Sequence, residues 1–290
     1  MYSKLLLGHG AAFLTILIWG TTFVSTKILL RVFTPVEILF LRFLLGFAVL
    51  AFARPQRLRG LTRRQHLLLA LAGLCGICLY YLLENIALTL TLASNVGVIV
   101  AAAPFFTALL SCLFLRERPL QASFFAGFAA AMTGVALISF NGAELQLNPL
   151  GDALALAAAL VWACYSLLVR RVSGWGLDVI LVTRQIFGYG LCFMLPSLLV
   201  FDCRFNLKLL AEPLYFGNLL FLGLGASALC FVTWNWAVQL LGAVRTSVYI
   251  YAVPVITVLT AAAVLGERLT AVSAAGIALT MAGLALSEWH

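Results

Sequence analysis

Apolar segments of about twenty residues follow one another along the whole chain, and each is long enough to cross a hydrocarbon layer about 30 Å thick. Of the 290 residues, 64% are hydrophobic and 10% are charged, whereas ordinary soluble domains have about 45–50% and about 25%. A water-soluble fold would have no place for this surplus of apolar side chains. The sequence therefore predicts a polytopic membrane protein whose largest partner is the lipid bilayer.

Within lipid, the backbone of each segment must satisfy its own hydrogen bonds, which favours helices. The short alternating strands of a membrane barrel are absent from the sequence. The first apolar run continues too far for a cleaved secretory signal, so we expect it to be a retained helix. We expect ten transmembrane helices, at about residues 9–29, 35–53, 65–88, 94–115, 120–140, 150–170, 177–201, 213–238, 243–265 and 270–288.

The third and fourth of these segments occur twice, because residues 73–119 align with residues 223–269. The alignment matches asparagine, proline and charged residues, which are scarce in apolar segments, so chance similarity does not explain it. We interpret it as an internal duplication. The aligned pairs include Trp19 with Trp162, Arg42 with Arg184, Asn85 with Asn235, Pro104 with Pro254, Glu117 with Glu267, Gly127 with Gly276 and Gly134 with Gly283.

Each copy contains five predicted crossings, and an odd number means that the second copy enters the membrane upside down relative to the first. Inverted repeats of this kind are typical of transporters, with the solute site at the repeat interface near the middle of the membrane. The predicted fold is all-α, with one five-helix repeat in residues 1–142 and a second in residues 143–290. The two repeats are expected to surround a central cavity.

The distribution of positive charge orients the bundle, because cytoplasmic loops carry an excess of Lys and Arg. The loop after the second segment is the most basic of the chain, so we place it in the cytoplasm with both termini. The net charge of +8 then indicates loops beside an anionic membrane surface, not a nucleic-acid partner. We expect a multi-pass plasma-membrane protein. Its inner basic residues are Lys4, Arg54, Arg57, Arg59, Arg63, Arg64, Arg116, Arg118, Arg170, Arg171 and Arg245, and its outer ones include Arg31, Arg204, Lys208 and Arg268.

Aromatic, hydroxyl and amide side chains share faces of segments that the duplication relates, which suits a cavity for an amphipathic solute. The alternative is that these side chains serve only helix packing and the aromatic belts at the membrane surfaces. The candidate substrate-binding residues are Trp19, Thr22, Tyr80, Tyr81, Glu84, Trp162, Tyr165, Trp234, Asn235 and Tyr249.

Glu84 lies within an apolar segment, on the helix face that it shares with Tyr80 and Tyr81. A carboxyl group in a membrane is costly and faces a cavity or a partner. We expect Glu84 either to contact a cation or carry a proton, or to form a structural ion pair with Arg42, which lies at similar depth.

Arg42 and its repeat mate Arg184 are candidates for coupling or ion pairing, and we interpret them as anchors between helices. Glu37 and Asp178, the nearest acidic residues, fall on other helix faces than these arginines. Their partners are therefore expected to come from other segments.

Pro104 and Pro254 interrupt the hydrogen-bond ladder in the middle of the fourth and ninth segments. The interruptions either let these segments move as gates or impose a fixed bend.

Gly127 and Gly134, and likewise Gly276 and Gly283, share one face of a helix and indicate close packing. We expect these faces to seat the fifth and tenth segments against their own repeats. The alternative is a homodimer that forms through them.

Motifs for metal, ATP or hydrolytic chemistry are missing from the sequence. Cys75-x-x-Cys78 has no second cysteine pair and no neighbouring histidine, so we interpret both as packing residues. There is no Walker A sequence, no HExxH and no nucleophile elbow. We expect no metal, no cofactor and no enzymatic activity.

The ordered set of motifs resembles the drug/metabolite transporter superfamily, in its EamA-type branch, over essentially the whole chain. The motifs are Trp19-Gly20 in the first segment, Arg42 after a Pro-led start, Asn85-x-Ala87, the mid-segment Pro104 and the terminal Glu117. The second copy departs from the pattern where Ala163, not Gly, follows Trp162.

The resemblance implies a basket-like bundle whose first, third, fourth, sixth, eighth and ninth segments line the cavity. It also implies transport of small metabolites or drugs, often outward. We therefore expect a secondary active exporter of an amino-acid-like or amphipathic, cationic solute, coupled to a proton or solute gradient. The alternatives are an importer or exchanger of the same fold, a passive channel and an intramembrane enzyme.

Overall fold

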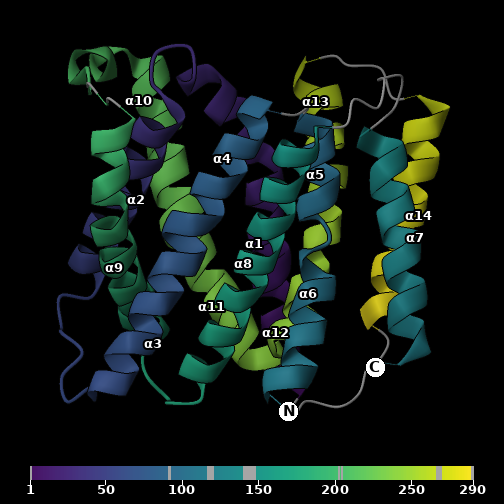
Figure 1. The fold of residues 1–290 in the computed structure, drawn as a ribbon, viewed down its shortest axis with the longest axis horizontal. Coiled ribbons are helices and arrows are strands. Elements are labelled where there is room, and N and C mark those ends of the chain that lie inside the picture. Colours follow the sequence, from purple (N-terminus) through teal and green to yellow (C-terminus); the bar gives the residue numbers. More distant parts are fainter. Residues whose placement is uncertain are drawn as a thin grey trace.

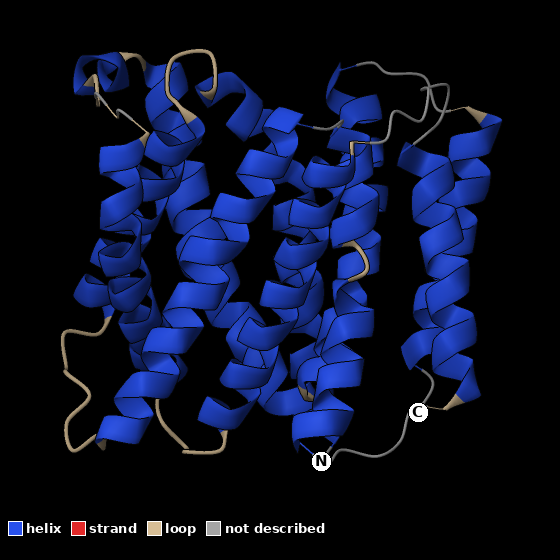
Figure 2. Ribbon diagram, viewed as in Figure 1, coloured by secondary structure: helices blue, strands red, loops and turns tan. Residues whose placement is uncertain are grey.

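A computed structural model of the chain describes residues 2–90, 93–115, 121–139, 148–201, 203, 205–265 and 270–288. Every regular element in these ranges is helical (Figure 2). Eight helical stretches are long and apolar enough to cross a membrane, and two shorter apolar helices cover 122–138 and 271–287. The protein is therefore an all-helical, polytopic membrane protein, while the number of ten crossings stays a prediction.

The helices of the first half coincide with the first five predicted segments. Two of these segments are subdivided by π-helical stretches, here labelled η1 and η2. The elements are α1 (Tyr2–Leu29), α2 (Pro35–Ala53), α3 (Arg63–Gly73), η1 (Leu74–Leu79), α4 (Tyr80–Leu90), α5 (Ala93–Val100), α6 (Ala103–Leu110), η2 (Ser111–Leu115) and α7 (Ala122–Ser139).

The helices of the second half coincide with the other five predicted segments. They include a π-helical stretch, η4, and two 3₁₀ turns, η3 and η5. The elements are α8 (Pro149–Ser173), α9 (Val179–Val200), η3 (Leu207–Ala211), α10 (Pro213–Leu220), η4 (Phe221–Leu229), α11 (Cys230–Leu241), α12 (Ala243–Ser247), η5 (Val248–Tyr251), α13 (Ala252–Leu265) and α14 (Ala271–Glu288).

Polar caps fix the points at which several helices begin. Thr34 and Glu37 form a reciprocal capping box at the start of α2, with Pro35 as the first helical residue. Thr62 caps α3 in the same way, and Asn148 accepts a hydrogen bond from Gly151 at the start of α8. These residues satisfy backbone N–H groups that a helix end leaves free, so the boundaries follow from the local sequence.

The buried core joins helices from both halves of the chain. The central helix α1 packs against α11 and α13, and α8 packs against α4 and α6. Towards the side of the bundle, α2 packs against α9 and η4 (Figure 1). The largest fully buried side chains in this core are aromatic or branched aliphatic, among them Trp234, Tyr165, Phe43 and Phe187.

The helices α7 and α14 stand side by side at one edge of the bundle and pack against each other (Figure 1). A Cβ atom added to Gly134 would lie 2.6 Å from the carbonyl oxygen of Gly276, and one added to Gly283 would lie 2.6 Å from that of Gly127. The backbones can approach this closely only because these residues lack side chains. The expectation that each glycine face packs against its own repeat is therefore wrong. A homodimer through these faces stays a prediction, and within one chain the faces already contact each other.

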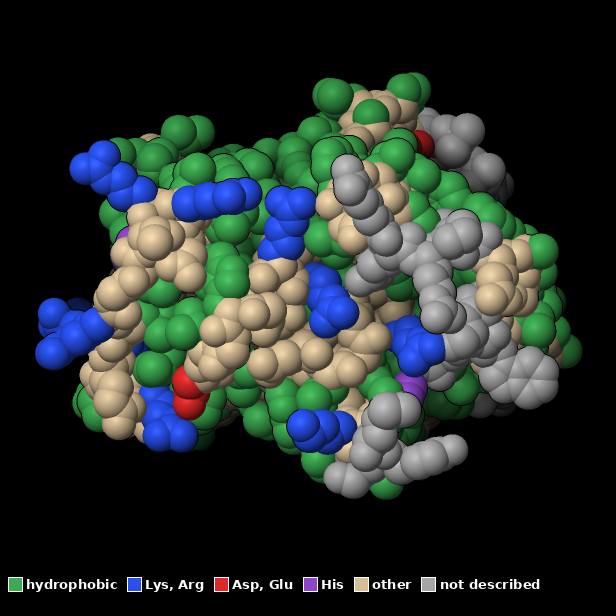
Figure 3. Space-filling model, turned by 90° about the horizontal axis from the view of Figure 1, so that it is seen from below, with side chains coloured by type: hydrophobic (Ala, Val, Ile, Leu, Met, Phe, Trp, Pro, Cys, Tyr) green, Lys and Arg blue, Asp and Glu red, His purple; other side chains and the backbone are tan. Residues whose placement is uncertain are grey.

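One end of the bundle is strongly basic. Figure 3 views the end where α1 begins, α2 and α8 end, and α3 and α9 begin, and it shows Lys and Arg side chains across this surface. The predicted inner residues that the structure describes lie on these elements, on their loops and on α12: Lys4, Arg54, Arg57, Arg59, Arg63, Arg64, Arg170, Arg171 and Arg245. The predicted roles of Arg116, Glu117, Arg118, Arg204, Glu267 and Arg268 fall outside the described residues.

Candidate functional site

Aromatic side chains from both halves of the chain meet in the buried core. The ring centroid of Trp19 on α1 lies 5.5 Å from that of Trp162 on α8 and 5.2 Å from that of Trp234 on α11. Tyr80 on α4 and Tyr165 on α8 lie 4.9 Å and 5.2 Å from the Trp162 ring. These separations fall in the range of about 4.5–7 Å at which rings attract. We call the connected rings the central aromatic cluster: Trp19, Phe43, Tyr80, Tyr81, Trp162, Tyr165, Phe187, Phe231 and Trp234.

The cluster includes most of the aromatic candidates and three residues that the sequence analysis missed. Phe43, Phe187 and Phe231 contact one another with centroids 5.1–5.6 Å apart. They were not singled out because the chain contains 21 phenylalanines, and nothing in the local pattern distinguishes these three. The only signal available was the alignment of Phe231 with Tyr81 in the duplicated stretch.

Two indole N–H groups in this cluster have no acceptor among the described residues. The side chains of Trp162 and Trp234 are only 4% and 0% exposed, and the Nε1 atom of each is buried without a hydrogen-bond partner. By contrast, Nε1 of Trp19 donates to the carbonyl oxygen of Ala226 at 2.9 Å. A buried donor without an acceptor costs about 1–3 kcal/mol, so these two groups call for a functional explanation.

A buried polar chain borders the cluster. The hydroxyl of Tyr165 donates to Oδ1 of Asn235 at 2.7 Å, and Nδ2 of Asn235 donates to Oγ1 of Thr183 at 3.0 Å. The three residues come from α8, α11 and α9. Asn235 also lines a small pocket, together with Val169, Val172, Ser173, Leu177, Val179, Val182 and Gln239. This pocket therefore extends from the α8–α9 turn, at the basic end, to the edge of the cluster.

Glu84 and Arg42 lie on opposite sides of a tyrosine pair. The hydroxyl of Tyr80 donates to Oε1 of Glu84 at 3.1 Å, and the rings of Tyr80 and Tyr81 are 4.9 Å apart. The guanidinium carbon of Arg42 lies 5.6 Å from the Tyr81 centroid, and its Nε donates to Oγ of Ser227 at 2.8 Å. Neither residue takes part in any salt bridge that the structure records among its described residues. Glu84 thus borders the cluster through its hydrogen bond with Tyr80, which is a member of the cluster.

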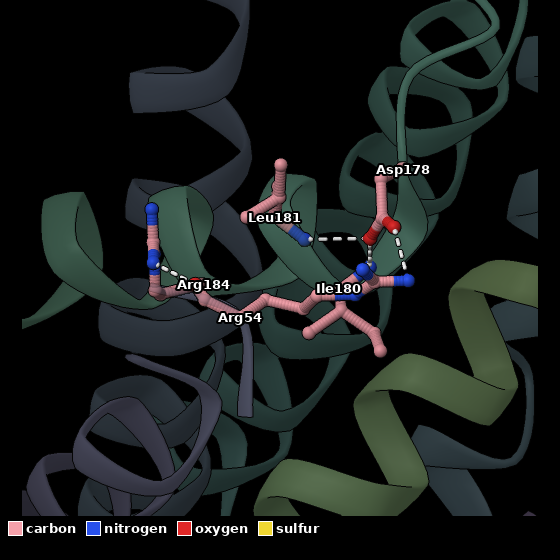
Figure 4. Close-up of polar contacts among 5 residues, drawn as sticks. All are labelled: Arg54, Asp178, Ile180, Leu181 and Arg184. Atoms are coloured by element: carbon pink, nitrogen blue, oxygen red, sulfur yellow. Dashed lines mark hydrogen bonds and ion pairs between the residues drawn. The ribbon is translucent and has the colours of Figure 1, made fainter. Parts of the chain in front are cut away.

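Arg184 lies apart from the cluster and holds a loop. Its guanidinium donates to the backbone carbonyl oxygens of Arg54 and Gln56, the latter at 2.5 Å. The side chain of Arg54 pairs with Asp178 at 3.5 Å, and Asp178 caps the start of α9 (Figure 4). The interactions tie the loop after α2 to α9, which agrees with the interpretation of Arg184 as an anchor.

Glu37 makes the reciprocal connection at the other end of α2. Its Oε2 accepts from the backbone N–H of Thr34 at 2.8 Å, and its Oε1 accepts from the backbone N–H of Phe205 at 2.7 Å. Phe205 follows α9 and has a positive φ of 37°. The loop after α9 is thus held by α2, just as the loop after α2 is held by α9.

Two candidate residues, Tyr249 and Thr22, are not members of the cluster, and the hydroxyl of each has a hydrogen-bond partner within the protein. Tyr249, on η5, lies near the start of α1, where its hydroxyl is 2.8 Å from Nδ1 of His9. Thr22 donates to the carbonyl oxygen of Trp19 in the preceding turn, at 2.7 Å. The sequence placed both residues on suitable segments, but it did not show that these polar groups have other partners.

Pro104 and Pro254 each lie in the first turn of a helix that follows a break. The helix α5 ends at Val100 and α6 begins at Ala103, while the 3₁₀ turn η5 precedes the start of α13 at Ala252. Proline lacks an N–H, so it fits the first turn and interrupts the ladder of a continuous helix. The structure shows the breaks, and their role as gates is a proposal.

Comparison with known proteins identifies the family and the fold of the chain. A model described as the EamA-like transporter family matches residues 6–140 and again residues 149–289. A solved structure of a protein, 22% identical, superimposes with a TM-score of 0.81 over 99% of this chain and 96% of the other, which shows that the fold is shared.

Relatives with curated descriptions span nearly the whole chain. A probable amino-acid metabolite efflux pump of Salmonella typhimurium is 30% identical, with 94% of this chain and 92% of the relative covered. A probable terminal-alkyne amino-acid exporter of Streptantibioticus cattleyicolor is 29% identical, with 95% and 91% covered. The chain is a multi-pass membrane protein that belongs to the EamA-like transporter family.

Proposed function

We propose that this protein is a secondary active transporter that exports a small amino-acid-like or amphipathic solute across the plasma membrane by alternating access. The observation that carries the proposal is the central aromatic cluster, in which rings from both halves surround buried polar groups. The descriptions of two relatives, an amino-acid exporter and an amino-acid metabolite efflux pump, support the solute class and the outward direction.

Contacts that each half makes with equivalent elements of the other half support ten crossings in two inverted repeats, residues 1–142 and 143–290. The π-helical stretch η1 packs against α9, and its counterpart η4 packs against α2. In the same way, α1 packs against α11, and α8 packs against α4. A two-fold axis in the membrane plane would interchange the members of each pair. The two separate matches to the family model support the same division.

Two of the π-helical stretches, η1 and η4, lie at equivalent places and precede the cluster in both halves. Residues 74–79 of η1 align with 224–229, which lie inside η4, and the aromatic residues of α4 and α11 follow directly. Wide turns of this kind are often found at functional sites. They rotate the residues that follow relative to a regular α-helix, which aims Tyr80 and Tyr81 in one half, and Phe231 and Trp234 in the other, at the repeat interface.

The solute binds among the rings, with its cationic group at Glu84 and Tyr80. The apolar rings contact the hydrocarbon part of the solute, while the carboxylate supplies charge in a low-dielectric site. Binding separates rings that contact one another in this structure, and the breaks before Pro104 and Pro254 let α6 and α13 move. Glu84 also serves as the proton carrier, because one carboxylate can hold either a proton or the solute cation.

The basic end faces the cytoplasm, and both termini lie on that side. This orientation follows the excess of Lys and Arg at the end seen in Figure 3. The small pocket that Asn235 lines near the α8–α9 turn then lies towards the cytoplasmic side.

Purified protein in proteoliposomes tests the proposal. A growth screen of overexpressing cells against toxic amino acids and cationic dyes first selects the labelled solutes. A carrier is identified by flux that saturates and that unlabelled solute on the opposite side of the membrane stimulates. Flux without saturation or counterflow identifies a channel. Recovery of a hydrolysed product instead of intact solute would identify an enzyme. Vesicles of known orientation with an imposed proton gradient then give the direction and the coupling.

A further inference from the structure

We propose that Trp162 and Trp234 bind the carboxylate of the transported solute through their indole N–H groups. The solute is then a zwitterion of the amino-acid class, with its ammonium group at Glu84, and a simple organic cation is a poor substrate. This inference rests on the proposed transport function and specifies its substrate.

The first observation is that the two donors are buried and unused. Trp162 and Trp234 are 4% and 0% exposed, and neither Nε1 atom has an acceptor among the described residues. Their ring centroids lie 6.1 Å apart, and both rings contact Trp19. A carboxylate has two oxygens, each with two acceptor sites, so one group can accept from both indoles. Hydrogen bonds to an ionised acceptor are also stronger than neutral ones.

The second observation is a departure from repeat symmetry at Trp162. Its repeat mate Trp19 donates to the carbonyl oxygen of Ala226, in η4. The equivalent acceptor for Trp162 is the carbonyl oxygen of Gly76, because Gly76 aligns with Ala226. That hydrogen bond is absent, and a Cβ atom at Gly76 would collide with the ring of Tyr165. Trp19 thus links α1 to η4 by a hydrogen bond, whereas Trp162 makes no equivalent bond and its N–H can donate to a solute.

The third observation is a difference in chemistry between equivalent positions. Glu84 on α4 aligns with Trp234 on α11. One half of the protein thus presents an anionic acceptor where the other half presents a neutral donor. Tyr80 connects the two sides, because its hydroxyl donates to Glu84 and its ring lies 4.9 Å from that of Trp162. A zwitterion matches this arrangement, with the cationic group at Glu84 and the anionic group at the indole N–H groups.

Two other arrangements make different predictions. Arg42 borders the cluster and could receive the carboxylate, although its guanidinium lies over the rings of Phe43 and Tyr81 and donates to Ser227. Alternatively, the indole N–H groups point at the faces of neighbouring rings and have no role in recognition. Replacement of tryptophan by phenylalanine distinguishes these arrangements, because it keeps a ring and removes the donor.

The test compares L-phenylalanine with its amide and with phenethylamine, and L-leucine with its amide and with 3-methylbutylamine, in proteoliposomes. The variants are Trp162→Phe and Trp234→Phe. The control is Trp236→Phe, which lies on α11 as Trp234 does but is 36% exposed. Arg42→Lys tests the alternative receptor. Size-exclusion chromatography of each variant in detergent shows whether the variant is folded.

The wild type and Trp236→Phe are expected to transport the amino acid in preference to its amine and amide. Each of the two buried variants should lower the apparent affinity for the amino acid by about tenfold or more, and should reduce the preference for the amino acid over its amine. Three results would overturn the inference: an unchanged preference in both buried variants, loss of the preference in Arg42→Lys alone, or a wild type that prefers the amines. Each of these three results would leave the proposed transport function itself intact. If no probe or screened solute shows counterflow, the proposed function itself fails.

Discussion

The hydroxyl of Tyr165 donates a 2.7 Å hydrogen bond to Asn235, although the two residues are 70 positions apart in the chain. Asn235 in turn donates to Thr183, so α8, α9 and α11 share one buried polar chain. Tyr165 belongs to the central aromatic cluster and Asn235 lines the small pocket at the basic end, so the polar chain connects the two.

The variant Tyr165→Phe should lower stability, because it leaves Oδ1 of Asn235 buried without this donor. The expected cost is about 1–3 kcal/mol, measured as a lower midpoint of thermal unfolding in detergent. Thr133→Ala is the control, because Thr133 is exposed and bonds only within its own helix. A midpoint for Tyr165→Phe equal to that of the control would show that the bond does not stabilise the fold.

The contact between α7 and α14 should not tolerate a methyl group at Gly283. A Cβ atom there would lie close to the backbone of Ala131 and Gly127, which cannot move without separating the helices. We expect Gly283→Ala to cost about 1–3 kcal/mol, as overpacking does, and to lower the yield of folded protein. Gly217→Ala is the matched control, because a Cβ at that helical position meets nothing within 4 Å. Equal yield and thermal stability of the two variants would contradict the packing described here.

The loop anchor predicts a change in protease sensitivity. Arg184→Gln removes the charged donors that hold the carbonyl groups of Arg54 and Gln56, so the loop with Arg57 and Arg59 should open more often. Trypsin should then cleave this loop faster in inside-out vesicles. Arg31→Gln, an exposed residue at the other end, serves as the control. If both variants are cleaved at the wild-type rate, Arg184 is not the anchor of this loop.

Much of the fold could be predicted from the sequence, because hydropathy and capping are local signals. The expected segment 35–53 coincides with α2, whose start is set by Thr34, Pro35 and Glu37. The alignment of the two halves also paired Trp19 with Trp162, whose ring centroids lie 5.5 Å apart in the structure. The packing of α7 against α14 could not be predicted, because a glycine face shows that something approaches closely and does not show what.

The hydrogen-bond partners of the buried polar side chains could not be predicted from the sequence either. Whether an indole N–H finds an acceptor depends on the position of a neighbouring backbone, as the contrast between Trp19 and Trp162 shows. The π-helical stretches η1 and η4 change the direction of the residues that follow them, and an apolar pattern of α-helical period does not reveal such turns.

Membrane orientation is tested by labelling single cysteines in a background without the seven native ones. Arg59→Cys should react with an impermeant maleimide in inside-out vesicles and not in intact cells, because the basic loop is cytoplasmic. Lys208→Cys, at the opposite end, should show the reverse pattern. Labelling of Arg59→Cys in intact cells would invert the proposed topology.

Glu84 is expected to couple transport to protons. With Glu84→Gln, an imposed proton gradient should no longer accelerate flux, because the amide cannot exchange a proton between the two sides. Glu212→Gln, an exposed residue before α10, is the control for loss of a carboxylate. Acceleration equal to that of the wild type would assign coupling to another group.

The central claim, that a solute site lies among the rings shared by the two halves, is tested most directly by counterflow through Trp162→Ala in proteoliposomes. The matched variant is Trp236→Ala, with an equal loss of side chain from an exposed position. We predict that Trp162→Ala loses saturable counterflow while it remains folded by size-exclusion chromatography, and that Trp236→Ala keeps it. Wild-type counterflow through folded Trp162→Ala would contradict the account.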